Sequence, residues 1–475
     1  MRKLAVRGFF FIIWMNCSVA ATEISLHDAI QMALKQNQSL ILSSYSPKLQ
    51  ENEIRRAYSV FDPQLISSYL HSNSTTALQL ESEVDTFSTT VSKYNSFGSK
   101  ISINYAQNIN DSNPPLSSSS STPHYTSSFG LGISQNLLKD FGESINMTKI
   151  SVTTRVHESS KYIFLKDILN TIYDVQVAYW DLYEAQKNYE LEMYGLWLIE
   201  ELLKQKERMV ELGGFPKALL QEIVASRADT MASVAVTQKK LNLSEINFMA
   251  VLGMQEGAFQ TTDIPKEYPI TNFNNDEYFL NQHPDILVNK IEIENYTQLV
   301  KYYDNQNLPS LSLTLNYSLH NPSAQEHHLS PYSNDHYFYS SGVVFSMPIN
   351  DSNAKADIEK NRLNILLATS KKEKLYHDIR VSIKKAKNEV ETIKNITNLS
   401  KISVNAQEEI MKNEDRKLEL GLTTMKNYLD NLNALIIKKK KLLSYECDMM
   451  RSFAGYFKAV GLAPEFLNID VSKLR

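Results

Sequence analysis

The chain has 475 residues, enough for two or three ordinary domains or for one large repeated domain. Its formal net charge is −4, so the charge gives no indication of a nucleic-acid partner. Glycine and proline are sparse, at 14 residues each, and this composition suits long, uninterrupted elements.

The N-terminus has the pattern of a secretory signal peptide. A basic region, a short apolar run and small residues before the cleavage point follow one another: Arg2, Lys3 and Arg7, then residues 9–15, then residues 18–21. The apolar run is shorter than the roughly 20 residues that a membrane-spanning helix needs. We therefore predict that residues 1–21 are a signal peptide and not an anchor.

The first half begins with a helix and then strands. Ser25 and Asp28 have the spacing of a capping box, and the helix that they open is predicted to run to about Tyr58. Residues 127–135 alternate between apolar and polar side chains, which is typical of a strand. The sequence leaves the partner of this strand open between two segments, 62–72 and 97–107.

A long helix is predicted over residues 144–212. Its apolar residues step by four and three, as in the seam of a coiled coil: Ile168, Ile172, Val175, Tyr179 and Leu182. It ends in the phrase Arg-Met-Val-Glu-Leu-Gly-Gly at 208–214. Pro216 then starts a return helix that ends at Gly253, because proline favours helix starts and glycine lies just past helix ends.

The second half repeats this order. Residues 310–320 and 337–347 alternate with period two and are predicted to pair as strands. A helix over 354–420 would be roughly 100 Å long at 1.5 Å per residue. It has the same seam: Ile379, Ile383, Ala386, Val390 and Ile393. It ends in Arg-Lys-Leu-Glu-Leu-Gly-Leu at 416–422, and a return helix then runs from Thr424 to Gly461.

The two halves are predicted to be one unit duplicated. The two Leu-Gly phrases lie 208 residues apart, and so do the glycines that end the return helices. Near the start of each half the offset is 246, so the first half carries 38 additional residues, which fit the serine-rich stretch at 117–121. The predicted boundaries are a signal peptide at 1–21, repeat 1 at 22–255, a linker at 256–276, repeat 2 at 277–462 and a tail at 463–475.

The predicted strands have one apolar face and one face of Ser, Thr and Asn. This pattern suits lipid on one side and a wet lumen on the other, and an ordinary soluble sheet is the alternative. We expect two strands per unit and four per chain. Four strands cannot close a barrel, and open strand edges are not tolerated in lipid, so several copies of the chain would have to close it together.

These features together resemble the TolC family of outer-membrane efflux and secretion ducts, over nearly all of the mature chain. The residues that carry the resemblance are the helix start Ser25-Leu26-His27-Asp28-Ala29-Ile30, the strand start Leu308-Pro309-Ser310-Leu311, the strand end Ser346-Met347-Pro348-Ile349, the Leu-Gly tips and the duplication. The resemblance implies a mainly α fold with a membrane β-barrel portion. Each duplicated unit would combine long coiled-coil helices with a β-hairpin, and a homotrimer would form a 12-strand β-barrel and a 12-helix α-barrel.

The resemblance also implies a function and partners. The protein would lie in the outer membrane of a Gram-negative bacterium, in contact with lipid, and extend into the periplasm. It would conduct substrates passively for a tripartite efflux or type I secretion system, with a periplasmic adaptor (membrane-fusion) protein and an inner-membrane pump, and without a cofactor. The sequence contains nothing that indicates the cargo.

In that family, adaptors dock at the helical tips. The resemblance therefore predicts two docking tips: Arg208, Leu212, Gly213, Gly214 and Phe215 on the first, and Arg416, Leu420, Gly421 and Leu422 on the second. A tight turn between antiparallel helices needs a glycine, and an exposed Leu or Phe beside it offers apolar contact. A plain helical turn without a partner is the alternative.

The family also has acidic residues around the pore entrance. On this chain those positions hold Asn427 and Asp430 after the second tip, and Leu219 and Glu222 after the first. Three copies of Asp430 facing one lumen would attract cations, whereas a solvated surface carboxylate is the simpler alternative. Leu219 and Leu418 occupy the positions of the family's polar contact, so an apolar contact between them could replace it.

Other functional classes have less support. No catalytic constellation emerges, so no enzyme is expected. Four histidines, at 320, 327, 328 and 336, lack a fixed spacing, so no metal site is predicted. A periplasmic coiled-coil adaptor or structural protein would explain the helices but not paired strands at the same point of both repeats, and a porin-like barrel would consist mostly of strands.

Overall fold

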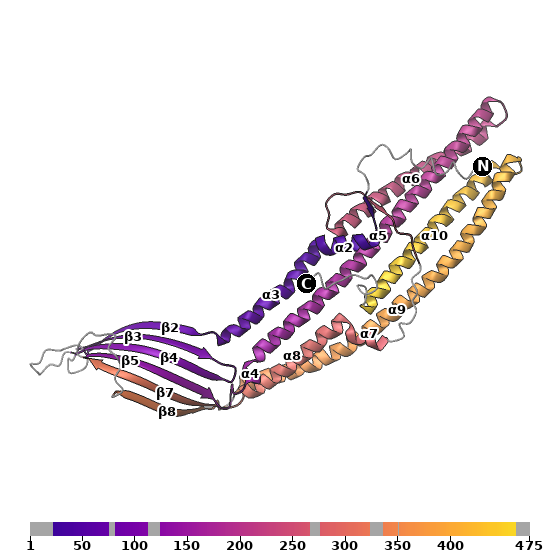
Figure 1. Ribbon diagram of the computed structural model, residues 1–475. Coiled ribbons are helices and arrows are strands. Elements are labelled where there is room, and N and C mark those ends of the chain that lie inside the picture. Colours follow the sequence, from indigo (N-terminus) through magenta and orange to yellow (C-terminus); the bar gives the residue numbers. More distant parts are fainter. Residues whose placement is uncertain are drawn as a thin grey trace, which may run out of the picture. The chain divides into compact units, whose positions relative to one another are not determined.

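The computed structural model describes residues 22–75, 81–112, 124–266, 276–323, 336–349 and 351–461 (Figure 1). The chain divides into two compact units. The first contains the chain up to Ser46, Tyr162–Leu287 and the chain from Glu373, and the second contains Pro47–Lys161 and Val288–Lys372. Each unit thus holds segments of both halves, and the boundaries of the two sequence repeats stay a prediction.

The opening helix is divided at Asn37. Helix α2 (Leu26–Gln36) begins at Ser25, whose hydroxyl accepts a hydrogen bond from the Asp28 amide as expected. Helix α3 (Gln38–Tyr58) follows, so the prediction of one continuous helix is wrong. Asn37 has an extended backbone, and its side-chain oxygen accepts from the Leu40 amide at 3.0 Å, which caps the new helix. A 3-10 turn, η1 (Ser59–Phe61), ends this segment.

The long helices occur where the sequence predicted them. The first hairpin consists of α5 (Thr148–Glu211), preceded by the short α4 (Glu143–Asn146), and α6 (Lys217–Leu252). The second consists of α9 (Ser352–Glu419) and α10 (Met425–Val460), and α7 (Asp276–Gln282) and α8 (Pro284–Gln306) precede it in the chain. Gly253 and Gly461 end the return helices with left-handed backbones, as the glycine positions predicted.

The coiled-coil seams form the core of the first unit. All five seam residues of α5 are buried, and those of α9 between 379 and 393 are buried or packed against the same cluster. A small parallel sheet of β1 (Thr22–Ile24) and β6 (Phe259–Thr261) lies beside α5. The hydroxyl of the buried Tyr179 donates to the Ile24 carbonyl at 3.2 Å, and it accepts from the Asp263 amide at 3.1 Å.

The second unit contains a six-stranded antiparallel sheet in the order β2-β3-β4-β5-β7-β8 (Figure 1). Its strands are β2 (Gln64–Thr75), β3 (Glu81–Tyr94), β4 (Ser99–Ser112), β5 (His124–Asn136), β7 (Ser310–Ser323) and β8 (Tyr337–Ser346). The predicted pairing of 310–320 with 337–347 is confirmed as β7 with β8. The partner of 127–135 is β4, and the other candidate segment pairs with β3 instead.

The expectation of four barrel strands per chain is wrong, because the described part of the chain contributes six strands to this sheet. The additional residues of the first half include β3, which the sequence reading missed. Its even-numbered positions are mostly Ser and Thr, but its odd-numbered positions mix charged residues with Phe87 and Val91, so apolar residues do not recur with period two. Three copies would therefore contribute 18 strands and not the expected 12.

Some predicted features lie outside the described residues. These are the signal peptide at 1–21, the serine-rich stretch at 117–121, His327, His328 and the tail at 463–475. Within the described part of the chain, no helix combines the length and the apolar character needed to cross a membrane.

Candidate functional site

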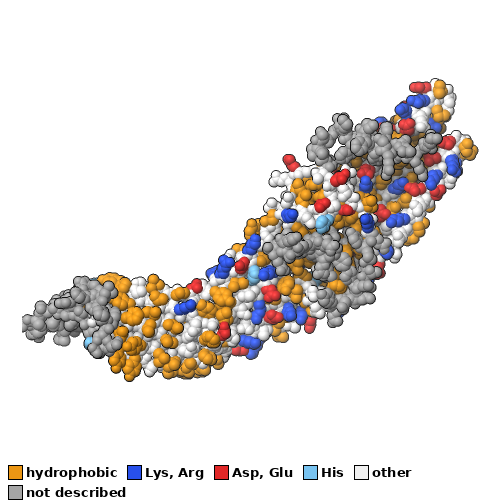
Figure 2. Space-filling view, in the orientation of Figure 1, with side chains coloured by type: hydrophobic (Ala, Val, Ile, Leu, Met, Phe, Trp, Pro, Cys, Tyr) orange, Lys and Arg blue, Asp and Glu red, His pale blue; other side chains and the backbone are white. Residues whose placement is uncertain are grey.

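The six-stranded sheet separates its side chains into two faces. Because side chains alternate along each strand and the register aligns odd-numbered residues across all five pairings, the odd-numbered residues share one face. We call it the apolar face, and it includes Leu65, Tyr69, Phe87, Val91, Ile101, Ile103, Tyr105, Phe129, Leu131, Ile133, Leu315, Tyr317, Tyr337, Tyr339, Val343 and Phe345. Hydrophobic side chains are dense over the strands in Figure 2, whereas most Lys, Arg, Asp and Glu lie over the helices.

The even-numbered residues form the polar face, which is rich in Ser, Thr, Asn and Gly. Its side chains bond across strands: the Ser68 and Ser88 hydroxyls lie 2.7 Å apart, and Asn316 donates to Ser340 at 3.3 Å. A Cβ added at Gly130 would lie 2.5 Å from Asn104 Oδ1, so an amide from the neighbouring strand lies over this glycine. A face of small polar groups is the expected lining of a water-filled lumen.

The two edge strands are β2 and β8, and neither has a second neighbour within the described part of the chain. Four large apolar side chains that are exposed on the polar face lie on these strands, Ile66, Leu70, Phe338 and Val344, and a fifth, Tyr94, lies at the end of β3. Unpaired strand edges with exposed apolar residues favour pairing with another strand.

The first tip closes α5 and α6 with a left-handed glycine. Gly213 has φ of 73°, and the Gly214 amide donates to the Met209 carbonyl at 2.8 Å. Leu212 is 87% exposed and Arg208 is also exposed. Phe215 is half-buried, and the Lys206 ammonium lies 5.4 Å from the centre of its ring.

The second tip repeats the turn with other side chains. Gly421 has φ of 72°, and the Leu422 amide donates to the Lys417 carbonyl at 2.7 Å. Leu420 and Leu422 are 72% and 73% exposed. The tip residues predicted from the sequence thus form exposed apolar ends, and their role in docking stays a prediction.

A polar contact that the sequence reading missed supports the second tip. Glu414 accepts hydrogen bonds from the Lys417 ammonium at 2.9 Å and from the Thr423 hydroxyl at 2.7 Å. These bonds hold the pKa of Glu414 below its ordinary value. The three-residue spacing of Glu414 and Lys417 on one helix could have predicted their ion pair. The hydrogen bond from Thr423 could not be predicted, because it forms only when the turn brings Thr423 back to the helix.

The predicted entrance residues lie on the helices behind the tips. Asp430, Asn427 and Glu222 are exposed. Leu418 packs against an apolar cluster that both hairpins form, together with Phe215, and Leu219 is not part of that cluster. The contact between Leu219 and Leu418 stays a prediction. Nearby, burial and the Asp415 carboxylate raise the pKa of Tyr428.

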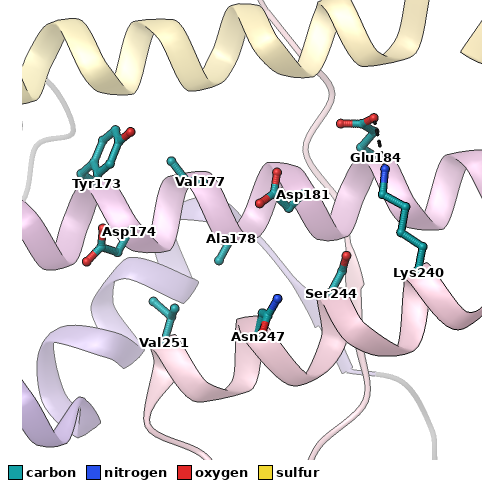
Figure 3. A pocket seen from close by; sticks show the side chains of 10 residues that line it. All are labelled: Tyr173, Asp174, Val177, Ala178, Asp181, Glu184, Lys240, Ser244, Asn247 and Val251. Carbon is teal, nitrogen blue, oxygen red and sulfur yellow. Dashed lines mark ion pairs between the residues drawn. The ribbon is translucent and has the colours of Figure 1, made fainter. Parts of the chain in front are cut away.

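A cleft of about 450 Å³ lies between α5 and α6 (Figure 3). Asp174 and Asp181 line it from α5, and burial raises the pKa of both carboxyls. Lys240 reaches from α6 to within 3.8 Å of Glu184, as the dashed line in Figure 3 marks.

Arg451 of α10, in the second hairpin, contacts the acidic residues of α5 beside this cleft. It donates to Asp181 at 2.5 Å, to Glu184 at 2.6 Å and to Asp448 at 2.8 Å. Because removing one partner would leave a half-buried charge without compensation, the network fixes the register of α10 against α5. The sequence reading missed it, because its members lie on different helices.

No family model matches the sequence. Among curated proteins, the outer membrane efflux protein BepC of Brucella suis biovar 1 (strain 1330) is 20% identical over 352 residues, which cover 74% of this chain and 75% of BepC. Among solved structures, CusC has a TM-score of 0.68 at 13% identity and covers 95% of both chains.

Two further channel structures are similar. The CmeC outer membrane channel of Campylobacter jejuni has a TM-score of 0.67 at 16% identity, over 92% of this chain and 85% of CmeC. The MtrE outer membrane channel of Neisseria gonorrhoeae has a TM-score of 0.65 at 14% identity, over 92% of this chain and 88% of MtrE. The chain therefore has the fold of these outer-membrane channels, as expected from its resemblance to the TolC family.

Proposed function

We propose that the chain is the outer-membrane channel of a tripartite efflux or type I secretion system in a Gram-negative bacterium. It passively conducts substrates across the periplasm and the outer membrane. The observation that carries this proposal is the sheet with one apolar face, one polar face and two unpaired edges. In lipid such a sheet is stable only when its edges are closed by pairing, with the apolar face outward. The fold shared with outer-membrane channels supports the same conclusion.

Three copies close the barrel by pairing β2 of one copy with β8 of the next. Because each chain contributes an even number of antiparallel strands, this seam is itself antiparallel. Odd-numbered residues of both edge strands lie on the apolar face, so odd residues pair with odd residues. The closed barrel has 18 strands, a size within the known range. Its circumference is about 1.5 times that of a 12-strand barrel.

The seam is testable with cysteine pairs. Leu65→Cys is combined with Val343→Cys or Phe345→Cys on the apolar face, and with Val344→Cys on the polar face as the control. The native Cys447 is fully buried and gives little background. We expect oxidation to yield covalent trimers for an odd-numbered partner and not for the control. A protein that extracts as soluble or with the inner membrane, with no covalent trimers for any pair, would refute the channel.

The tips bind a periplasmic adaptor, which links the channel to an inner-membrane pump. Leu212, Leu420 and Leu422 are apolar side chains at exposed turns. A partner that covers them removes apolar surface from water, which favours binding. Photo-crosslinkers at these three positions should capture the adaptor in living cells. The exposed Lys239 of α6 is the control position. If a crosslinker at a tip position captures no more adaptor than the crosslinker at position 239, that tip does not bind the adaptor.

The periplasmic adaptor or structural protein remains the second candidate. The long hairpins favour it, because paired helices are all that such a protein needs. The six-stranded sheet disfavours it, because an adaptor without a barrel has no use for a continuous apolar face on six strands. Detergent extraction with the outer membrane, and a trimer band on a gel that heating converts to monomer, distinguish the channel from this alternative.

A further inference from the structure

One group of polar side chains interrupts the apolar face of the sheet. His71 on β2 and Asp85 on β3 lie directly opposite each other, and Glu83 lies two residues from Asp85. His71 Nδ1 is 2.8 Å from Asp85 Oδ1 and 3.8 Å from Glu83 Oε1. One nitrogen and two carboxylate oxygens thus lie within 4.8 Å of one another.

We propose that His71, Glu83 and Asp85 form a divalent transition-metal site with three protein ligands. In a tetrahedral zinc site, with bonds of about 2.0–2.2 Å to nitrogen and oxygen, neighbouring ligand atoms lie about 3.4 Å apart. The two distances from His71 bracket that value, so rotation of the exposed side chains is enough to reach coordination geometry.

The electrostatics of the group favour a cation. Glu83 and Asp85 are like charges two residues apart on the same face of one strand, so they repel each other. A neutral imidazole can donate its Nδ1 hydrogen to only one of the two carboxylates. Among the described residues, the ion pairs of both carboxylates involve His71 alone. A divalent cation would neutralise both carboxylates at once.

The surroundings of Asp85 hold it in position. The Tyr69 hydroxyl donates to Asp85 Oδ1 at 2.7 Å, as expected of a group that orients a metal ligand. Phe87 lies opposite Tyr69, and Ile109 lies opposite Asp85 on the next strand.

The donor set selects the metal. One imidazole nitrogen with carboxylate oxygens suits Zn²⁺, whereas a site for Cu⁺ would require sulfur ligands. Ca²⁺ prefers six to eight oxygen ligands, more than this group offers. Because His71 comes from the edge strand and both carboxylates come from its neighbour, bound Zn²⁺ would tie β2 to β3. The proposal rests on the geometry of the sheet and not on transport, so either can fail alone.

The test uses the mature full-length protein in detergent, freed of metal and titrated with Zn²⁺ by calorimetry. We expect one site per chain. His71→Ala and Asp85→Asn should each weaken Zn²⁺ binding at least about tenfold, because each removes a ligand. Tyr69→Phe keeps all three ligands and should weaken binding about tenfold through the lost orientation of Asp85.

Two controls make the result decisive. His320→Ala removes a histidine of β7 that bonds Ser318 on the polar face, and it should leave Zn²⁺ binding unchanged. The double variant His327→Ala/His328→Ala tests whether these two adjacent histidines bind Zn²⁺ instead of His71. Binding that survives His71→Ala but is lost in the double variant, or the absence of a bound Zn²⁺ in the unmodified protein, would overturn the proposal. X-ray absorption of bound Zn²⁺ should detect one imidazole and no sulfur, and any other ligand set would equally overturn it.

Discussion

The two helical tips share one backbone turn but hold it with different side chains. Positions 206 and 215 of the first tip correspond to 414 and 423 of the second at the repeat offset of 208. The first pair is Lys206 over the ring of Phe215, and the second is Glu414 with the Thr423 hydroxyl. The glycine turn fixes the backbone, so the side chains around it are free to differ and to give each tip its own surface.

The largest expected difference between the tips is in adaptor binding. The second tip exposes Leu420 and Leu422, whereas Leu212 is the corresponding exposed leucine of the first. Burying one leucine contributes about 1.5–3 kcal/mol, so each lost leucine should weaken docking about tenfold or more. The double variant Leu420→Asp/Leu422→Asp should reduce adaptor co-purification more than Leu212→Asp. Lys204→Asp, on α5 before the tip, is the control. Equal losses in both tip variants would contradict a dominant second tip.

The predicted pore entrance extends the comparison to the helices behind the tips. Glu222 and Asp430 occupy equivalent positions, and both are exposed. If α10 lines the lumen, three Asp430 carboxylates attract cations, and Asp430→Ala should weaken block by a trivalent cation on the order of tenfold in single-channel recordings. Glu222→Ala should have a smaller effect. The reverse order would assign the entrance to the first hairpin.

The elements that the sequence predicted depend on local signals. Gly253 and Gly461 end helices because their left-handed backbones disfavour other residues, and this can be read from a single position. In the second half, β7 alternates strictly over 310–320 and β8 has most of its apolar residues at odd positions, and the two strands were predicted with their pairing. Strand β3 lacks that alternation because charged residues share its odd-numbered face with Phe87 and Val91, so its existence and the six-stranded sheet became evident only in the structure.

The parts of the candidate site that the sequence could not predict are contacts between distant residues. Arg451 meets Asp181 only because two hairpins pack at one register. His71 meets Glu83 and Asp85 only because β3 pairs with β2, and the sequence did not indicate that strand. The break at Asn37 was not predicted, because the apolar periodicity of α2 indicated a continuing helix. The capping role of Asn37 for the next helix is evident only from its hydrogen bond with the Leu40 amide.

Helix capping after the turn distinguishes the tips more subtly. The Thr424 hydroxyl accepts from the Asn427 amide at 3.2 Å, whereas Pro216, its equivalent, makes no side-chain cap. Thr424→Ala should therefore destabilise the first turn of α10 by about 1 kcal/mol. Hydrogen exchange at the Asn427 amide should accelerate about fivefold. Pro216→Ala is the matched substitution and should leave exchange in the first turn of α6 within twofold. Equal acceleration at both tips would contradict a side-chain cap at Thr424.

The smallest expected difference is in the response of the tips to pH. Because hydrogen bonds hold the pKa of Glu414 below its ordinary value of 4.5, its contribution is complete above that pH and is lost as the pH falls through the lowered pKa. The second tip should therefore loosen in acid, with faster hydrogen exchange at the Leu422 amide. The contact of Lys206 with Phe215 involves no carboxylate, so the Gly214 amide should show no matching change.

Two variants separate this acid response from general acid denaturation. Glu414→Gln removes the titrating carboxylate and should give exchange at Leu422 that is fast and independent of pH, once the intrinsic exchange rate is corrected for. Lys206→Met removes the cation above Phe215 and should speed exchange at Gly214 at every pH by only a small factor, because such exposed contacts contribute about 0.5–1 kcal/mol. If Glu414→Gln retains the acid response, another titrating group stabilises the turn of the second tip. The two tips would then differ in their exposed side chains, but the contact of Glu414 with Thr423 would not account for their different response to pH.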